Sequence, residues 1–600
     1  MRNHVLCYTR KPIDSVLYDP RLAYSMHLAL SKDGLHYQGL NHNSGVLFVR
    51  ATENKDGSLN PMSLKNPFLF YLKDGSFGVL AIRIEADGDP DESSKGSVVF
   101  FTSRDLLIYH EEGLINLSDS FIERVQCRFD PQHNYYSLCW SDEKGTSQYA
   151  HTDVLLSGQS LSCVETDTLL SAPAVDQVQM TDMEGAVVQN SIEVSDEVAD
   201  RLKKKLTTPV NTGVSFPDEI SVHSQAELDD YRATLSYSDG TAIRRRVDWD
   251  LSKVNFNTSG DYEIHGNIQQ EHFPFPVAYN RADPCIKRWN NKYYFIATND
   301  ADDNHTLYVR EADTITGLVH AEEHLILDSS TYEGIGGLLW APEFHEINGT
   351  LYIFHAATPG EFFWEESCLM ELRKGGNPAC REDWSAPKRI VKKDGSDLCE
   401  AGKTISLDMT CFSWEGSWYV IWSQREFLPK DLGAWLYIAE LNPQEPWKLL
   451  SDPVILSKPD YGWGNNHTFV EEGPYALVSK DNLYITFSAA AVDTSYVVSY
   501  LVIVPGKDLL TPANWRKNNY PILTSRSVDG EYGTGHNAYV IDEDGLVWNT
   551  YHARPGTEGV RSSGIRRVHF DIDGAPMLDV TEELDLNENC REVSTVLHIS

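Results

Sequence analysis

Residues 283–298 read DPCIKRWNNKYYFIAT, and this unit recurs through the second half of the chain. Each copy starts with a polar residue, passes through a turn and ends in a strand rich in aromatic and β-branched side chains. The other copies are EFHEINGTLYIFHAAT (343–358), DMTCFSWEGSWYVIWS (408–423), EGPYALVSKDNLYITFS (472–488) and HNAYVIDEDGLVWNTYH (536–552). Their first residues are 60, 65, 64 and 64 positions apart. Five regular copies of a turn and strand predict a β-propeller of five blades.

The repeat has a geometric consequence for the residues that begin each copy. If each copy starts the innermost strand of its blade, the five leading side chains converge on one central pocket. Three of them are the carboxylates Asp283, Asp408 and Glu472. Turn-and-strand units are common in β proteins, so a chance alignment is the alternative, and the regular intervals argue against it.

The rest of the chain is also rich in short strands and Asp-Gly or Asn-Gly turns, which predicts an all-β protein. Weaker copies of the repeat begin at Asn66 and Gln126, where amides replace the acids. Ser195 begins a helical stretch that ends at Leu206, and the segment after it alternates as a small immunoglobulin-like β-sandwich. We therefore expect four parts: an N-terminal propeller-like β region without catalytic acids (1–165), a linker with a short helix (166–213), the sandwich (214–270) and the catalytic propeller (271–600).

Composition narrows the class of partner. The formal net charge is −37, which argues against nucleic acid and anionic membrane surfaces, because both require a basic footprint. No run approaches the ~18 apolar residues of a membrane span, and the start of the chain has no apolar stretch of the signal-peptide type. The ten cysteines form no CxxC pair, so we expect reduced thiols and a cytoplasmic protein. The sequence does not indicate an oligomeric state.

Three clustered carboxylates suit the cleavage of a glycosidic bond. That reaction needs one group to protonate the leaving oxygen and another to direct attack at the anomeric carbon. Glu472 has the longer reach and is the natural acid, while crowded like charges favour keeping one group protonated. Strand alternation allows only one of Glu471 and Glu472 to face the pocket, and Glu472 holds the leading position of the repeat.

The second half resembles glycoside hydrolase family 43 over residues 272–600. The motifs RADPCIKRWNNKYYF, LLWAPEFHEINGTLYIF, SLDMTCFSWEGSWYVIW, EEGPYALVSKDNLYITF, GTGHNAYV and FDIDGAPML carry the resemblance in this order. It implies that Asp283 is the general base, Asp408 the pKa modulator and Glu472 the general acid. It also implies that His536 lies near a hydrated calcium or sodium ion at the propeller axis, with no organic cofactor.

Further residues are candidates for binding the substrate. The resemblance favours Arg561 for this role, with Arg554, Arg566 and Arg567 as rivals close in sequence. Aromatic faces pack against sugar rings, so Trp340 and Trp414 are candidates for lining the pocket.

We therefore expect an inverting, exo-acting α-L-arabinofuranosidase that acts on plant cell-wall oligosaccharides. A β-xylosidase and an endo-arabinanase use the same three acids and remain alternatives, as does a carbohydrate-binding propeller without catalysis. A fructan-cleaving enzyme would need an earlier acidic nucleophile of the WMNDP kind, which this half of the chain does not contain.

Overall fold

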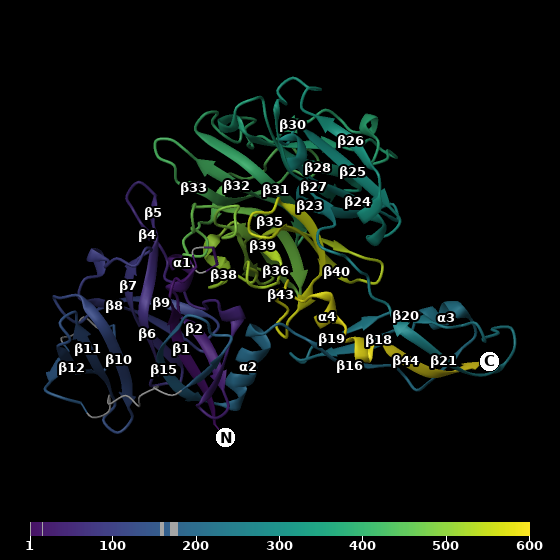
Figure 1. Cartoon of the computed structure of the whole chain (residues 1–600). Coiled ribbons are helices and arrows are strands. Elements are labelled where there is room, and N and C mark those ends of the chain that lie inside the picture. The colour runs from purple at the N-terminus through teal and green to yellow at the C-terminus, as the bar shows by residue number, and fades with distance from the viewer. Residues whose placement is uncertain (1, 15, 18, 157–160, 168–177) are drawn as a thin grey trace.

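The computed structural model describes residues 2–14, 16–17, 19–156, 161–167 and 178–600. Residues 168–177 of the expected linker, and 157–160 of the expected N-terminal region, lie outside the described residues. The described chain is all-β, as predicted, and forms an N-terminal region, a propeller and a small sandwich that carries the C-terminus (Figure 1). Within these described ranges, no helix has the length and apolar character needed to cross a membrane.

The second half forms five four-stranded sheets, which confirms the predicted five-bladed propeller. From the inner strand outward, blade one consists of β23 (Arg281–Trp289), β24 (Lys292–Asn299), β25 (Thr306–Ala312) and β26 (Glu323–Asp328), and blade two of β27 (Gly337–Ile347), β28 (Thr350–Thr358), β29 (Glu366–Glu371) and β30 (Lys388–Arg389). Blade three consists of β31 (Thr404–Trp414), β32 (Ser417–Glu426), β33 (Gly433–Glu440) and β34 (Val454–Ser457), and blade four of β35 (Glu471–Ser479), β36 (Asn482–Ala489), β37 (Val497–Ile503) and β38 (Arg516–Lys517). Blade five consists of β39 (Glu531–Ile541), β40 (Val547–Pro555), β41 (Ser562–Arg567) and β22 (Ala278–Tyr279).

The ring of blades is closed by a strand that precedes the first blade in sequence. Strand β22 precedes blade one in sequence but forms the outer strand of blade five, where Ala278 pairs with Ser563 of β41. Each inner strand contacts the inner strand of the next blade, and β39 contacts β23. All five inner strands therefore surround one axis, which brings the leading residues of the repeat into a common neighbourhood.

The N-terminal region consists of three sheets placed side by side. They are ordered β14 (Gln179–Thr181), β3 (His36–Gly39), β2 (His27–Ser31), β1 (Asn3–Arg10) and β15 (Ala186–Val194); β6 (Met62–Tyr71), β7 (Phe77–Glu85), β8 (Ser97–Ser103) and β9 (Tyr109–Asn116); and β10 (Ile122–Asp130), β11 (Tyr135–Asp142), β12 (Ser147–Thr152) and β13 (Ser162–Val164). This region differs from the expected 1–165 because β14 and β15, which we placed in the linker, complete its first sheet. Their pairing with β3 and β1 is long-range, so no local pattern reveals it.

Helix α2 (Asp196–Leu206) follows β15 and begins as predicted, because the Ser195 side chain accepts a hydrogen bond from the backbone N–H of Val198. Its basic residues reach the propeller. Arg201 and Lys205 lie 2.8 and 3.1 Å from the Asp573 carboxylate. The helix thus joins the N-terminal region to the propeller by ion pairs rather than acting as a free linker.

The small sandwich has two sheets. They are β16 (Asn211–Ser215), β18 (Ala233–Tyr237) and β19 (Ala242–Arg245), against β17 (Glu219–Val222), β44 (Glu592–Ile599), β21 (Gly260–Ile268) and β20 (Val247–Trp249). The structure differs here from the expected bounds 214–270 and 271–600, because β44 leaves the propeller and occupies an interior position of the second sheet. The sequence pattern of β44 predicts a strand, but only the fold determines which sheet it joins.

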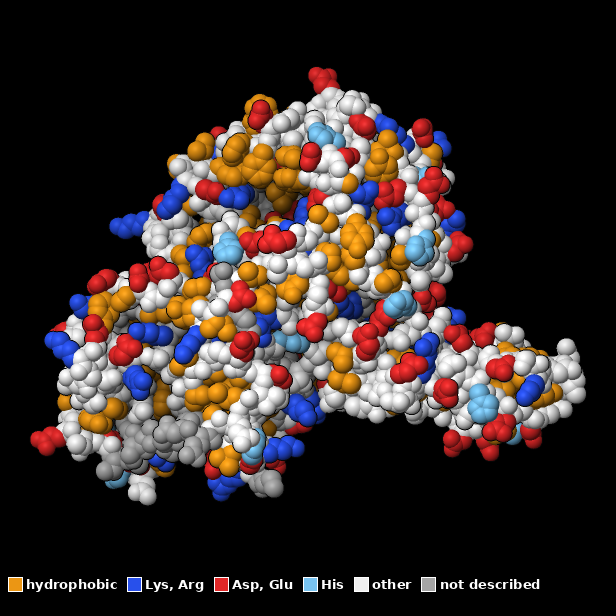
Figure 2. All heavy atoms as spheres, in the orientation of Figure 1, with side chains coloured by type: hydrophobic (Ala, Val, Ile, Leu, Met, Phe, Trp, Pro, Cys, Tyr) orange, Lys and Arg blue, Asp and Glu red, His pale blue; other side chains and the backbone are white. Residues whose placement is uncertain are grey.

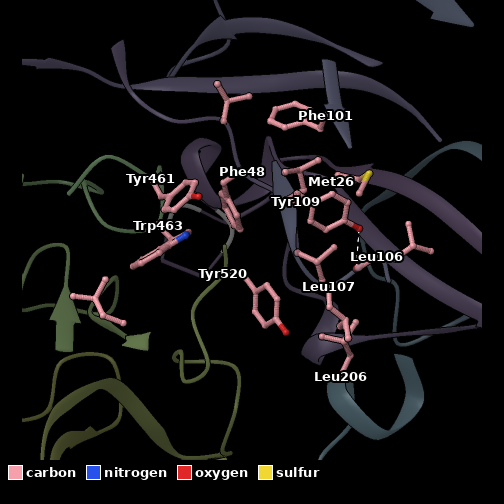
Figure 3. Packing of buried hydrophobic residues seen from close by; sticks show 14 of the residues in the cluster. Met26, Phe48, Phe101, Leu106, Leu107, Tyr109, Leu206, Tyr461, Trp463 and Tyr520 are labelled. Carbon is pink, nitrogen blue, oxygen red and sulfur yellow. Dashed lines mark hydrogen bonds between the residues drawn. The ribbon is translucent and has the colours of Figure 1, made fainter. Parts of the chain in front are cut away.

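The N-terminal region and the propeller share one hydrophobic core. Met26, Phe48 and Phe101 from the first region pack in the same cluster as Tyr461, Trp463 and Tyr520 from the propeller (Figure 3). Trp463 is fully buried, and its Nε1 donates a hydrogen bond to the Asn519 backbone oxygen at 3.0 Å. Burial of such large side chains supplies the main favourable energy of an interface. The two parts therefore form one structural unit.

Candidate active site

Each inner strand of the propeller contains a bulge. At this point the strand register shifts and the backbone enters the left-handed region. The residues in this conformation are Asp283 (φ 50°), Ala341 (φ 46°), Asp408 (φ 55°), Gly473 (φ 54°) and His536 (φ 53°). Asp283, Asp408 and His536 are repeat leaders, as expected, whereas Glu472 lies just before its bulge. Glu343 lies two residues beyond its own and pairs with His345 at 2.7 Å.

Asp283 is buried and held by four neighbours. The Thr298 hydroxyl donates to its Oδ2 at 2.6 Å, and Nδ1 of His552 lies 2.9 Å from its Oδ1. His536 Nδ1 and Arg561 Nη1 are 3.2 and 3.4 Å from the same oxygen. Burial alone would raise the pKa of Asp283, but the positive His536 and Arg561 and the His552 hydrogen bond hold it well below its ordinary value. This carboxylate is therefore ionised.

Asp408 and Glu472 lie in an environment that favours a proton. Burial, together with the charges of Glu472 and Asp283, raises the pKa of Asp408 to about 8 against the opposing charge of His536. Burial also raises the pKa of Glu472, although its Oε1 accepts a 2.7 Å hydrogen bond from the Tyr496 hydroxyl. The backbone N–H of Gly473 donates to Asp408 at 3.0 Å and links the two groups. Neighbouring groups of like charge favour keeping one of them protonated.

Glu471 points away from these groups, as strand alternation predicts. Its carboxylate forms an ion pair with Lys517, which also contacts Asp460 at 2.8 Å. Glu472, not Glu471, belongs to the cluster with Asp283 and Asp408.

His536 lies between the two aspartates, 3.2 Å from Asp283 and 3.9 Å from Asp408. Burial would lower its pKa, but the nearby carboxylates outweigh burial and raise it. Its Nε2 is buried and has no hydrogen-bond partner among the described residues. The residues described include no group of three or more His, Cys, Asp or Glu side chains arranged to hold a metal. A single imidazole does not suit calcium, which prefers ~6–8 oxygen ligands, so water molecules would have to complete the shell of the expected hydrated calcium or sodium ion near His536.

Arg561 is the arginine that reaches the carboxylate cluster. Its Nε and Nη2 donate to Asp300 at 2.9 and 2.8 Å, which orients Nη1 toward Asp283. Two of the rivals, Arg566 and Arg567, are held elsewhere by Glu531 and Asp585. The third, Arg554, donates to the Val492 backbone oxygen at 2.8 Å, and its Nη1 is buried without a hydrogen-bond partner in the described part of the chain.

The two tryptophans have different positions. Trp340 precedes the bulge residue Ala341, and its Nε1 donates to the Asn304 side chain at 2.7 Å. The Ala341 N–H donates to Thr298 at 2.8 Å, so Trp340 adjoins the surroundings of Asp283. Trp414 lies at the turn end of β31, six positions beyond Asp408 in sequence, and packs on the hydrophobic core. Trp414 is not part of the site, because it is the last residue of β31 and lies six positions from the bulge at Asp408.

Three residues of the cluster were not among the sequence candidates: Thr298, His552 and Tyr496. His552 stacks on Tyr496 with 5.4 Å between ring centroids, which ties the surroundings of Asp283 to those of Glu472. A signal for two of them exists, because each repeat copy ends at an equivalent position. Thr298, Thr358, Ser423 and Ser488 end four copies and His552 the fifth. Ser423 and Ser488 bond the inner strand of the following blade at 2.8 and 2.7 Å.

The site contains one ionised carboxylate, Asp283, and two carboxyl groups that favour a proton, Asp408 and Glu472. This combination is what the hydrolysis of a glycosidic bond requires. The family model for glycosyl hydrolases family 43 matches residues 273–576. The extracellular exo-alpha-(1->5)-L-arabinofuranosidase of Streptomyces chartreusis is 33% identical over 284 residues, 46% of this chain and 81% of that protein. Alpha-L-arabinofuranosidase B of Pyricularia oryzae is 32% identical over 321 residues, 50% of this chain and 63% of that protein.

A solved structure of an alpha-L-arabinofuranosidase from Lactobacillus brevis shares 28% identity and a TM-score of 0.45, covering 50% of this chain and 94% of that one. The family match extends over half of the chain, and the chain belongs to glycosyl hydrolases family 43. It is a glycoside hydrolase, and its substrate is a carbohydrate.

The expected cytoplasmic location is wrong. Relatives from Streptomyces chartreusis and Streptomyces avermitilis are named extracellular enzymes, and this finding overturns the expectation. Our expectation relied on the scattered cysteines and on the start of the chain, which has no apolar stretch of the signal-peptide type; all ten cysteines are free in the structure. Disulfides are favoured by an oxidising compartment but are not required there, so free thiols do not determine location.

The pKa shifts predict a one-sided pH profile. Asp283 stays ionised at acidic pH because its pKa is lowered, whereas Asp408, whose pKa is raised to about 8, and Glu472, whose pKa is also raised, keep a proton to higher pH than ordinary carboxyl groups. We expect kcat/KM to fall on the alkaline side. Asp408→Asn removes a negative neighbour of Glu472, which should move the alkaline limb to lower pH. Initial rates on an aryl glycoside across the pH range test this, and an unmoved limb in a folded variant would remove Asp408 from that role.

Proposed function

We propose that this enzyme is an inverting, exo-acting α-L-arabinofuranosidase that releases arabinose from plant cell-wall oligosaccharides. In this proposal Asp283 is the general base, Glu472 the general acid and Asp408 the group that modulates the acid's pKa. Arg561 and Trp340 bind the sugar. The observation that carries the proposal is the contrast within one cluster, where Asp283 is held ionised while Asp408 and Glu472 favour a proton.

The choice of arabinose is supported by the names of the matched relatives, which are arabinofuranosidases. Initial rates on an aryl α-L-arabinofuranoside, an aryl β-D-xyloside and linear arabinan test this choice. We expect the arabinofuranoside to be the best of the three. Faster cleavage of the xyloside would make the enzyme a β-xylosidase, and release of internal fragments from arabinan would make it endo-acting.

The proposed roles predict the stereochemistry of the product. With Asp283 as base, a water molecule must fit between this carboxylate and the anomeric carbon. This requires the carboxyl groups of Asp283 and Glu472 to be about 6.5–9.5 Å apart. The first product should then have inverted anomeric configuration. Proton NMR of the earliest product, recorded before mutarotation, measures this. Retention would mean that Asp283 acts as a nucleophile.

A further inference from the structure

The propeller carries a cluster of exposed aromatic side chains on the loop before β29. Phe362, Phe363 and Trp364 form the short helix η6 (Phe362–Trp364), and these residues are 37%, 47% and 44% exposed. Phe427, from the segment after β32, packs against both phenylalanines with ring centroids 5.7 and 4.9 Å apart. We call these four residues the aromatic platform. A contiguous exposed apolar surface of this kind marks an interaction site more often than chance exposure does.

The platform is continuous with the carboxylate cluster. Phe362 lies 6.1 Å from Trp340 between ring centroids, and Trp340 donates to Asn304. Asn304 in turn donates to Asp300 at 2.9 Å, the residue that orients Arg561 toward Asp283. In Figure 2, hydrophobic side chains gather beside a hollow on the propeller. The aromatic platform therefore lies next to the candidate active site.

The loop that carries the platform is anchored to the site. Glu365, the next residue, is fully buried, and burial together with the nearby charge of Asp408 raises its pKa. On the other side, the Gly402 N–H donates to the Phe363 backbone oxygen at 2.9 Å. The backbone that carries the exposed rings is therefore fixed on both sides, by the buried Glu365 before β29 of blade two and by the hydrogen bond from Gly402 before β31 of blade three.

We propose that the aromatic platform binds the sugar units on the leaving-group side of the scissile bond, in a neutral pentose oligosaccharide. This inference rests on the proposed function, because an exo-acting pocket takes only the terminal sugar and the remaining chain must leave through the opening. The apolar faces of neutral sugar rings pack against aromatic faces. The net charge of −37 disfavours acidic polysaccharides as the occupant.

The test is the double substitution Phe363→Ala with Trp364→Ala, with Tyr279→Ala as a matched control. Tyr279 is 63% exposed and lies on β22, the outer strand of blade five. The double variant should lose roughly tenfold in kcat/KM on arabino-oligosaccharides of three or more units, mostly through KM. On an aryl α-L-arabinofuranoside it should stay within about twofold of the parent enzyme, because this substrate lacks the extended chain. The control should match the parent on both substrates.

Equal losses on both substrates, or unchanged kinetics on the oligosaccharides, would overturn the platform. If the parent enzyme prefers xylosides, the proposed arabinose specificity fails, and the same comparison with xylo-oligosaccharides and an aryl β-D-xyloside still tests the platform. Calorimetric binding of the preferred oligosaccharide in an Asp283→Asn background supplies a second measurement. The platform substitutions should weaken this binding, and unchanged binding would contradict the proposal.

Discussion

Asp283→Asn is expected to lower kcat by at least ~10²-fold, on natural oligosaccharides and on aryl glycosides alike. The amide cannot accept a proton from the attacking water, and this need does not depend on the leaving group. The substitution keeps the shape of the side chain, so Thr298 can still donate to its oxygen. Initial rates on both substrate types measure the effect.

Folding of the Asp283→Asn variant must be checked independently, because the carboxylate neutralises His536 and Arg561 in a buried site. Arg561 retains Asp300, so we expect a cooperative thermal transition close to that of the parent protein. Near-native turnover by a folded variant would exclude Asp283 as the base. A loss confined to the oligosaccharides would indicate a binding role instead.

Glu472→Gln should show a different dependence on substrate. Loss of the general acid is expected to cost at least ~10²-fold on oligosaccharides, whose leaving alcohol needs protonation, but less than ~10-fold on an aryl glycoside with an acidic phenol. A series of aryl glycosides of increasing phenol pKa measures this dependence. Equal losses across the series would contradict the acid role of Glu472.

The chain offers a matched control in the adjacent residue. Glu471→Gln changes the same functional group on the opposite face of β35, where it weakens the ion pair with Lys517. Because Lys517 retains Asp460, we expect a loss of stability on the order of 1–3 kcal/mol and nearly unchanged kcat per folded molecule. Thermal unfolding and active-enzyme concentration separate these outcomes. A large loss of kcat in this variant would reverse the assignment of the two glutamates.

Several features of the site could be predicted from the repeat alone. Regular intervals bring Asp283, Asp408 and His536 to the axis, because equivalent positions on the inner strands of a closed ring must face it. The same logic distinguished Glu472 from Glu471, since adjacent side chains on a strand point to opposite faces. Trp414 shows where this reasoning fails. It is an aromatic residue on an inner strand, but it lies at the end that packs into the core.

The sequence by itself determined the all-β class, the number of blades and the placement of Asp283, Asp408 and His536 on the inner strands, because strand periodicity and turn residues are local properties. Only the tertiary structure decided that β15 completes the N-terminal sheet and that β44 joins the sandwich, because backbone pairing between distant segments has no local signature. It alone also showed that His552 and Tyr496 connect Asp283 with Glu472. The protonation states follow from the same cause: a carboxylate's pKa depends on burial and on charges brought near by the fold, so three similar acids acquire opposite tendencies.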